Sequence, residues 1–409
     1  MPDQNKQEAP RRIHMRYRGH LGQARIFLVK MLRMFIYQKD WIVLPMATLI
    51  AGLVGFVVRD RFFFSMEGTL VSALALACVC IWNGCFNSIQ VICRERDVIK
   101  REHRAGLHMS SYILAHMLYQ ALLCMIQTII TVYITWAVGV NYPAKGLFTP
   151  FYLPELCVSI FLITYAADMM SLWISAMCHT TTIAMTVMPM VLILQLVFSG
   201  GMMSLPAQLK PVTNLIICNH GLKLITAQAD YNSQPLASVW NTLFSVRYDE
   251  FSITVKVGQV LDYLNNSDDP TVEEIRKTGI TDAELYLKDN ADLEISFQEI
   301  AKEITGSQRV PKNVTIGDLA ERLSSDPDAE ELREQPLTIT FTPDQLIRMV
   351  GEDDARNYIL DKTSEAAKKD EYDYTAENIL RYWWIMICFV LAFAALAMIT
   401  LEFIDKDKR

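Results

Sequence analysis

The chain has 409 residues, of which 52% are hydrophobic and 20% are charged, and its net charge is −7. A chain with this many apolar and aromatic residues is not mainly disordered. Nine cysteines in this length are too few for a small disulfide-stabilised scaffold. Because apolar and charged residues are both abundant, they must be concentrated in different parts of the chain.

Apolar stretches along the chain predict a helical membrane protein. A helix that crosses the hydrocarbon core of a bilayer, about 30 Å thick, needs roughly 20 apolar residues. Six stretches meet this requirement, near 41–58, 69–93, 112–138, 153–177, 183–203 and 380–403. The first is the shortest. We therefore expect an all-α membrane body with six transmembrane helices.

Basic residues predict the orientation of these helices. Residues 1–40 contain nine Lys and Arg against three Asp and Glu, and residues 94–104 contain five Lys and Arg. The chain ends in a third basic segment, 405–409. Six crossings place all three segments on one side, which the positive-inside rule assigns to the cytoplasm. We expect a multi-pass protein of the plasma membrane with both termini cytoplasmic. The basic clusters flank apolar spans, so they do not indicate nucleic-acid binding.

An acidic segment separates the fifth and sixth apolar stretches. Residues 233–378 carry 31 acidic and 15 basic side chains, a net charge of −16, whereas the rest of the chain has a net charge of +9. Alternating or β-branched residues predict strands at 251–257 and 337–341. Helical patterns begin or run at 281–284, 315–323, 342–349 and 364–369. This predicts an α+β domain inserted between helices 5 and 6, and five preceding spans make it extracytoplasmic.

Motifs of enzymes and metal sites are absent from the sequence. It contains no GxxxxGK[ST] phosphate loop, no GxSxG, no HExxH and no CxxC pair, so we expect no catalytic residue, no metal and no ATPase site in this chain. The acidic domain has neither Cys nor His, and its clusters Asp268–Asp269 and Glu352–Asp354 do not match an EF-hand. A solvated acidic surface is the favoured interpretation. Cys218 is the one cysteine away from the spans, and we expect a half-buried, unpaired thiol there. The alternative is a disulfide with its copy across a dimer axis.

Two sequence blocks resemble a known transporter family. The first is Asn83-Gly-Cys-Phe-Asn-Ser-Ile-Gln90 with Arg94-Glu-Arg-Asp-Val-Ile-Lys-Arg-Glu102, followed by Gly106 and a Ser-Tyr pair. The second is Phe198-Ser-Gly-Gly-Met-Met-Ser-Leu205 with residues 218–232. With the six-span layout, they resemble the permeases of G-subfamily (white/multidrug half-transporter type) ABC transporters over about residues 20–232 and 380–405. That family's fused ATPase domain is missing, so the resemblance is to a stand-alone permease subunit of prokaryotic type, with type-2 ABC exporter architecture.

The resemblance implies a coupling segment near 94–111. In the family this segment contacts the nucleotide-binding subunit, which holds ATP and Mg²⁺, while the permease itself binds no cofactor. The corresponding residues here are Glu95, Arg96, Ile99, Arg101 and Glu102, with Ile99 where the family usually has Phe. Helical spacing places Glu95, Ile99 and Glu102 on one face and makes Asp97 and Arg101 an i, i+4 pair. The alternative interpretation is a solvated hairpin loop.

An amphipathic helix at 21–39 resembles the family's connecting helix. It completes a cytoplasmic segment, residues 1–40, that precedes the transmembrane region 41–203. Cationic and apolar positions alternate in it, so we expect it in the membrane interface with its cations at the lipid headgroups: Arg25, Lys30, Arg33 and Lys39. The alternative is a simple basic flank.

The resemblance also implies a substrate path across a dimer. Asn83, Phe86 and Asn87 match the face of the second span that lines the family's central cavity, although hydrogen bonding between helices is an equal alternative. Phe198, Gly201, Met202 and Met203 match the family's exit gate, before a re-entrant external segment at 204–232. Helix-end packing is the alternative there. For Asp168 we favour a structural partner such as Thr164 or a neighbouring backbone group, and the alternative is a proton or cation site. For Pro189 we expect a looser fifth span, and the alternative is a role in packing alone.

These features favour one function over two others. We expect a membrane-spanning permease subunit of an ATP-driven exporter for an amphipathic or hydrophobic substrate such as a lipid, drug or peptide. It would act as a homodimer or paired heterodimer with a separate ATPase subunit. The alternatives are a non-transporting receptor and a mechanotransmission subunit, each acting through the acidic domain at 233–378. Residues 379–409 form the last span and tail.

Overall fold

The computed structural model describes residues 19–37, 40–202, 206–267, 270–281, 314–325, 333–334 and 336–403. Two compact units divide the chain. One comprises residues 1–235 and 367–409, and the other comprises residues 236–366. The sequence predicts that the inserted domain spans residues 233–378. The structure instead assigns the last twelve of these residues, 367–378, to the first unit.

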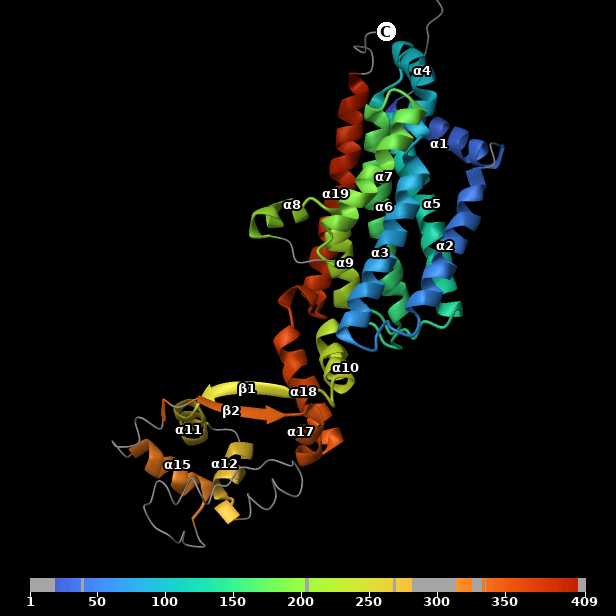
Figure 1. The fold of residues 1–409 in the computed structure, drawn as a ribbon. Coiled ribbons are helices and arrows are strands. Elements are labelled where there is room, and N and C mark those ends of the chain that lie inside the picture. The colour runs from blue at the N-terminus through green and yellow to red at the C-terminus, as the bar shows by residue number, and fades with distance from the viewer. Residues whose placement is uncertain are drawn as a thin grey trace, which may run out of the picture. The chain divides into compact units, whose positions relative to one another are not determined.

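The first unit is a bundle of long helices (Figure 1). Its main helices are α1 (His20–Tyr37), α2 (Val43–Val58), α3 (Met66–Ser88), α4 (Val91–Arg104), α5 (Met109–Ala137), α6 (Tyr152–Met177), α7 (Thr181–Val197), α9 (Ile217–Gln228) and α19 (Ala376–Glu402). Helices α1 and α4 lie at the end of the bundle where α19 also ends (Figure 1). The basic segment 94–104 therefore lies at the end of the bundle where α19 ends. The basic segment 405–409 lies outside the described residues.

Five apolar helical segments of the described chain are long enough to cross a membrane. They are Asp40–Val58, Met66–Arg104, Met109–Ala137, Tyr152–Met177 and Ala376–Glu402, and they agree with five of the six predicted stretches. A break after Ser88 separates α3 from α4, so the second segment contains a span followed by a distinct charged helix.

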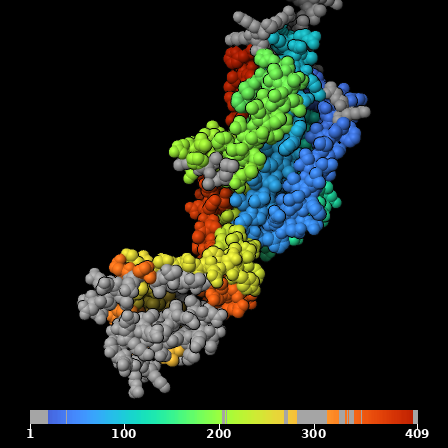
Figure 2. Space-filling view, in the orientation of Figure 1, coloured from blue at the N-terminus to red at the C-terminus, as the bar shows by residue number. Residues whose placement is uncertain are grey.

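The fifth predicted span is not one continuous helix. Helix α7 ends at Val197 rather than near 203, and its 17 residues cover about 25 Å at 1.5 Å per residue. The chain then forms the short helices η2 (Ala207–Leu209) and α8 (Lys210–Thr213), which stand out from the side of the bundle (Figure 2). It returns as α9, where nearly every residue is buried against α3, α6 and α19. The region 204–232, expected to be external, thus contains a helix that the bundle buries.

Helices α3 and α6 form the tightest pair in the bundle core. Gly84 lies at their contact, where an added Cβ would overlap with the carbonyl oxygen of Thr164. Small residues at such contacts let two membrane helices approach closely. The hydroxyl of Ser171 donates to the carbonyl of Cys85 at 2.7 Å and holds the same pair together.

The second unit is a small α+β fold. Strands β1 (Phe251–Lys256) and β2 (Pro336–Phe341) pair antiparallel, with Phe251 opposite Phe341. The helices are α10 (Ala237–Ser245), α11 (Val257–Asn266), α12 (Pro270–Lys277), α15 (Ile316–Ser325), α17 (Pro343–Val350) and α18 (Glu352–Ala367). Both predicted strands and the helices predicted at 315–323 and 342–349 are present. The pattern at 364–369 is only partly helical, because α18 begins at Glu352 and ends at Ala367. The helix predicted to open at 281–284 lies almost entirely outside the described residues.

Two local features stabilise the first turns of helices α17 and α18 in this unit. Thr342 caps α17 by accepting from the backbone amide of Gln345, whose side chain accepts from the amide of Thr342 in return. The acidic cluster Glu352–Asp354 forms the first turn of α18, where negative charge interacts favourably with the helix dipole. Asp268 and Asp269 lie outside the described residues. Among the residues that are described, no group of His, Cys, Asp and Glu is arranged to hold a metal ion.

Candidate functional site

Helix α4 carries the predicted coupling residues and is anchored to two other helices. Ile99 is fully buried, while Glu95 and Glu102 lie on the same face, as the helical spacing predicts. Both carboxylates face α1, where the ammonium of Lys30 lies 3.5 Å from Glu95 and 4.0 Å from Glu102. The expectation that Lys30 points to lipid headgroups is therefore wrong, because two carboxylates of α4 attract it. Lys39 lies outside the described residues.

A second set of contacts joins α4 to the end of α6. The guanidinium of Arg96 donates to the carbonyl oxygens of Ala176 at 2.8 Å and Cys178 at 3.1 Å. These carbonyls end α6 and lack partners within that helix, so a cation is favourable there. The hydroxyl of Ser175 accepts from the first amides of α4, those of Ile92 and Cys93, at 3.1 and 3.2 Å. Each helix thus caps the other.

The contact between Arg101 and Asp97 differs from the predicted pair of side chains. Its Nε donates to the main-chain carbonyl of Asp97 at 3.3 Å, four residues earlier, rather than to the Asp97 carboxylate. Arg101 and Asp97 are on the exposed face of α4, away from α1. This leaves charged side chains of α4 directed outward at the end of the bundle, where a second protein can reach them.

Asp168 is the centre of a buried polar network between α3, α5 and α6. Ser88 donates to one of its carboxylate oxygens, and the thiol of Cys124 lies 3.7 Å from the other. Gln120 donates to the hydroxyl of Ser88 at 2.7 Å. The structural role predicted for Asp168 agrees with these contacts, but its partners are Ser88 and Cys124 rather than Thr164. The sequence missed them because they come from two other helices.

The three predicted cavity residues have different surroundings. The side chain of Asn87 exchanges hydrogen bonds with the amide of Gln127 on α5, at 2.8 and 2.9 Å. For Asn87 the alternative of a structural bond between helices is therefore present. Asn83 is buried, whereas Phe86 is partly exposed and stacks on Trp82, with 5.7 Å between ring centroids. Phe86 is thus the most exposed of the three.

The predicted gate residues follow the end of α7. Gly200 has a φ of +75°, which ends the helix without strain. Gly201 lies against Leu74 and Leu222, so close that an added Cβ would be 2.8 Å from a methyl carbon of Leu222. Met202 points outward and is 60% exposed. Phe198 is half-buried, and Met203 lies outside the described residues.

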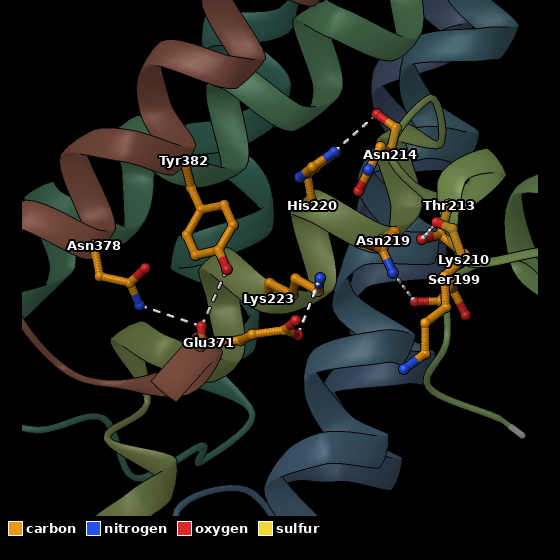
Figure 3. A network of polar contacts seen from close by, with 10 residues as sticks. All are labelled: Ser199, Lys210, Thr213, Asn214, Asn219, His220, Lys223, Glu371, Asn378 and Tyr382. Atoms are coloured by element: carbon orange, nitrogen blue, oxygen red, sulfur yellow. Dashed lines mark hydrogen bonds and ion pairs between the residues drawn. The ribbon is translucent and has the colours of Figure 1, made fainter. Parts of the chain in front are cut away.

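A group of polar contacts, the junction, joins α9 to the segment that leads into α19 (Figure 3). The sequence analysis did not predict it. The ammonium of Lys223 on α9 lies 3.0 Å from the carboxylate of Glu371, in the short helix η5 (Asp370–Tyr372). The main-chain carbonyl of Glu371 accepts from the Tyr382 hydroxyl at 3.1 Å and from Asn378 at 3.2 Å, both on α19 (Figure 3). The junction therefore ties α9 to α19. The sequence feature that could have indicated this junction is Lys223, a lysine within the apolar block 214–227.

Further contacts extend this junction along the chain. The amide of Asn232 bonds with the main chain of Lys369 in both directions, at 3.0 and 3.1 Å. Tyr231 packs edge-on against Tyr372 with 5.0 Å between centroids. Burial raises the pKa of the Tyr372 phenol above its usual range, and the nearby Glu371 carboxylate adds to this, so Tyr372 stays protonated at neutral pH.

Helix α9 is also anchored to the end of α7. Cys218 is fully buried, which corrects the expected half-buried position, and its amide donates to the side chain of Gln195 at 3.0 Å. Asn219 donates to the carbonyl of Ser199 at 2.9 Å, and a ring nitrogen of His220 lies 3.0 Å from the carbonyl of Asn214 (Figure 3). These bonds hold the main chain at Ser199 and Asn214 onto α9.

Comparison with known families accounts for the bundle. Residues 25–216, from within α1 to the residue before α9, match the family model described as ABC-2 type transporter. No curated protein matches the chain. Residues 25–216 are therefore an ABC-2 type membrane domain, which implies the permease component of an ABC transporter.

Proposed function

We propose that this chain is the membrane-spanning permease subunit of an ATP-driven exporter of the G-subfamily-like type. It moves an amphipathic or hydrophobic substrate such as a lipid, drug or peptide. A separate ATPase subunit, with its own ATP and Mg²⁺, binds at the end of the bundle formed by α1 and α4. Both termini lie in the cytoplasm, and residues 233–378 lie outside it.

The observation that carries this proposal is the anchoring of α4. Its buried face is held by Lys30 of α1, and its first turn is locked to the last turn of α6 by Ser175 and Arg96. A helix fixed at these points moves its neighbours when a partner displaces it. Its outer face, with Asp97 and Arg101, presents charged side chains suited to a cleft on a partner protein.

A pair of permeases would form the substrate path between them. Helices α3 and α7 lie on one visible face of the bundle (Figure 2). Large apolar side chains are exposed on both helices: Val71, Trp82, Phe86, Ile183, Met190, Ile193 and Leu194. We place the cavity along this face, with Phe86 at its wall and Met202 at its outer end. The partner is a second copy or a paired relative.

The junction favours mechanotransmission as a second candidate. Lys223, Asn232 and Glu371 tie together the two chain segments that lead to and from residues 236–366. Tension on α9 or α19 therefore reaches both segments at once. In this second function the complex moves no substrate, and its ATPase cycle drives the acidic unit.

Reconstitution with the partner tests both candidates. The chain alone in vesicles should hydrolyse no ATP, and hydrolysis should appear with the ATPase subunit. Glu95→Lys places a second cation beside Lys30, so it should separate hydrolysis from transport, and Lys30→Glu in the same chain should restore coupling. The reversed pair keeps its attraction, so failure of the rescue with normal assembly would contradict the role of this contact. Hydrolysis by the isolated chain would contradict the proposal itself.

A further inference from the structure

A pocket of about 250 Å³ lies between α1 and the helices α3, α4 and α5. Its apolar wall includes Phe27 and Met31 from α1 and Leu123 from α5. Water occupies about 30 Å³ per molecule in the liquid, so the space corresponds to roughly eight non-hydrogen atoms. This is the size of a polar head with the first carbons of a chain, not of a whole lipid.

His116 of α5 borders this pocket and is 2% exposed. Neither of its ring nitrogens has a hydrogen-bond partner among the described residues. A neutral imidazole carries one donor and one acceptor, and an unpartnered buried polar group is costly. A hydroxyl or an amide of an occupant can hydrogen-bond to one of these nitrogens, whereas a pure hydrocarbon can bond to neither.

The mouth of the pocket carries balanced charge. Lys30 and Glu95 line it together at 3.5 Å, and Arg94 lies 3.8 Å from Asp40, which also lines it. Each cation among the described lining residues already has a carboxylate beside it. A ligand with a net charge would have to compete with one of these pairs, so the pocket favours ligands without net charge.

We propose that this pocket binds an amphiphile without net charge whose polar group hydrogen-bonds to His116 and whose chain lies against Phe27, Met31 and Leu123. Arg94 and Glu95 of α4 also line the pocket. An occupant therefore lies beside α1, α4 and α5 together and stiffens the contact between α1 and α4 that the proposed function uses for coupling. This effect on coupling rests on the proposed function. Phe86, which the proposed function places at the wall of the substrate cavity, also lines the pocket, as does Asn87. Binding itself is measured without an ATPase partner, so its failure leaves the proposed function standing.

Photolabelling of the full-length chain tests the proposal. The chain is reconstituted in phosphatidylcholine vesicles that contain either a diazirine-bearing monoacylglycerol or a diazirine-bearing phosphatidylcholine, and labelled peptides are mapped by mass spectrometry. Labels are expected within 27–34 and 116–123. Labelling by phosphatidylcholine identifies a bilayer lipid as the occupant, and labelling by the single-chain probe alone identifies a free single-chain amphiphile. A phosphatidylglycerol probe with the same diazirine should label these segments less.

Variants show whether labelling depends on the pocket. His116→Phe removes both ring nitrogens and should reduce labelling about three- to ten-fold, as expected for one lost hydrogen bond. His116→Gln keeps a donor and an acceptor and should retain most of it. Met31→Trp fills the pocket from α1 and should reduce labelling without touching His116. Thr128→Val removes another buried, unpartnered polar atom of α5, outside the lining, and should change nothing.

Two outcomes overturn the proposal. One is equal labelling of 27–34 and 116–123 in the wild type, His116→Phe and Met31→Trp. The other is absence of label from these segments with both uncharged probes while the exposed side of α2, around Leu49 and Leu53, is labelled. In either case the probes report only general contact with the bilayer.

Discussion

Replacement of Gly84 by alanine measures how much of the bundle depends on the α3–α6 contact. The new Cβ would overlap with the carbonyl oxygen of Thr164, and it would lie 2.8 Å from the amide nitrogen of Asp168 and 3.0 Å from the Cβ of Ala167. Backbone atoms and a one-carbon side chain cannot rotate away. The two helices must therefore move apart.

The size of the effect follows from three contributions. Overpacking of a core costs about 1–3 kcal/mol. Separation also weakens the hydrogen bond from Ser171 to Cys85 and that from Ser88 to Asp168, each with a net value of about 1 kcal/mol. Alanine is better than glycine inside a helix by about 1 kcal/mol, which offsets part of the loss. The net destabilisation expected for Gly84→Ala is about 1–4 kcal/mol.

The assay is the apparent melting temperature of the purified full-length chain in detergent, followed by tryptophan fluorescence. Gly52→Ala on α2 is the matched control, because its added Cβ meets only a methyl group of Ile134 at 3.7 Å, an ordinary contact. We expect Gly84→Ala to melt well below the wild type and Gly52→Ala to melt at or slightly above it. Equal melting of all three proteins would refute the close approach of α3 and α6.

Three further predictions concern the buried network, the gate and the topology. Asp168→Leu leaves Ser88 without its acceptor and should lower the free energy of unfolding by about 1–3 kcal/mol, with Asp168→Asn in between, as measured by the same melting assay. Met202→Ala should raise basal ATPase activity or leak of the assembled complex while subunit assembly, measured by co-purification, stays normal; unchanged leak would remove Met202 from the path. A cysteine introduced at Ser325 should react with an impermeant maleimide on intact cells, whereas one at Val98 on α4 should react only after lysis. The reverse pattern would invert the topology.

Most of the membrane helices can be predicted from the sequence. A helix that crosses the bilayer needs about 20 apolar residues, and runs of this length are recognisable from composition alone. The fifth span is the exception. The apolar run continues from α7 through Phe198 and Met202, so hydropathy extends the helix to 203. The structure ends it at Val197, because Gly200 and Gly201 allow a turn and a close approach to Leu222. The glycine pair was visible in the sequence, but its effect depends on what it packs against.

The face of α4 proposed for coupling also depends on both neighbouring and distant residues of the sequence. Helical spacing places Glu95, Ile99 and Glu102 together, since positions three and four residues apart share a face. That their partner is Lys30, far away in the sequence, depends on where α1 crosses α4, and no local pattern contains this. The choice for Asn87 between a cavity and a bond to Gln127 likewise depends on the relative register of α3 and α5.

Stiff and compliant contacts are unevenly distributed in the bundle. Lys30, Arg96 and Ser175 join α4 to α1 and α6, and the Asp168 network continues from α6 into α3 and α5. The Lys30 ion pairs are partly exposed, whereas the bonds of Ser175 and of the Asp168 network are buried. Buried hydrogen-bonded contacts transmit displacement because they have few alternative arrangements. The fifth crossing is different, since Pro189 interrupts hydrogen bonding in α7 and the chain leaves the bundle before α9. A displacement of α4 should therefore move α1, α3, α5 and α6 together. In the proposed function, we expect the deformation that opens a path to occur between α7 and α9, where Met202 lies.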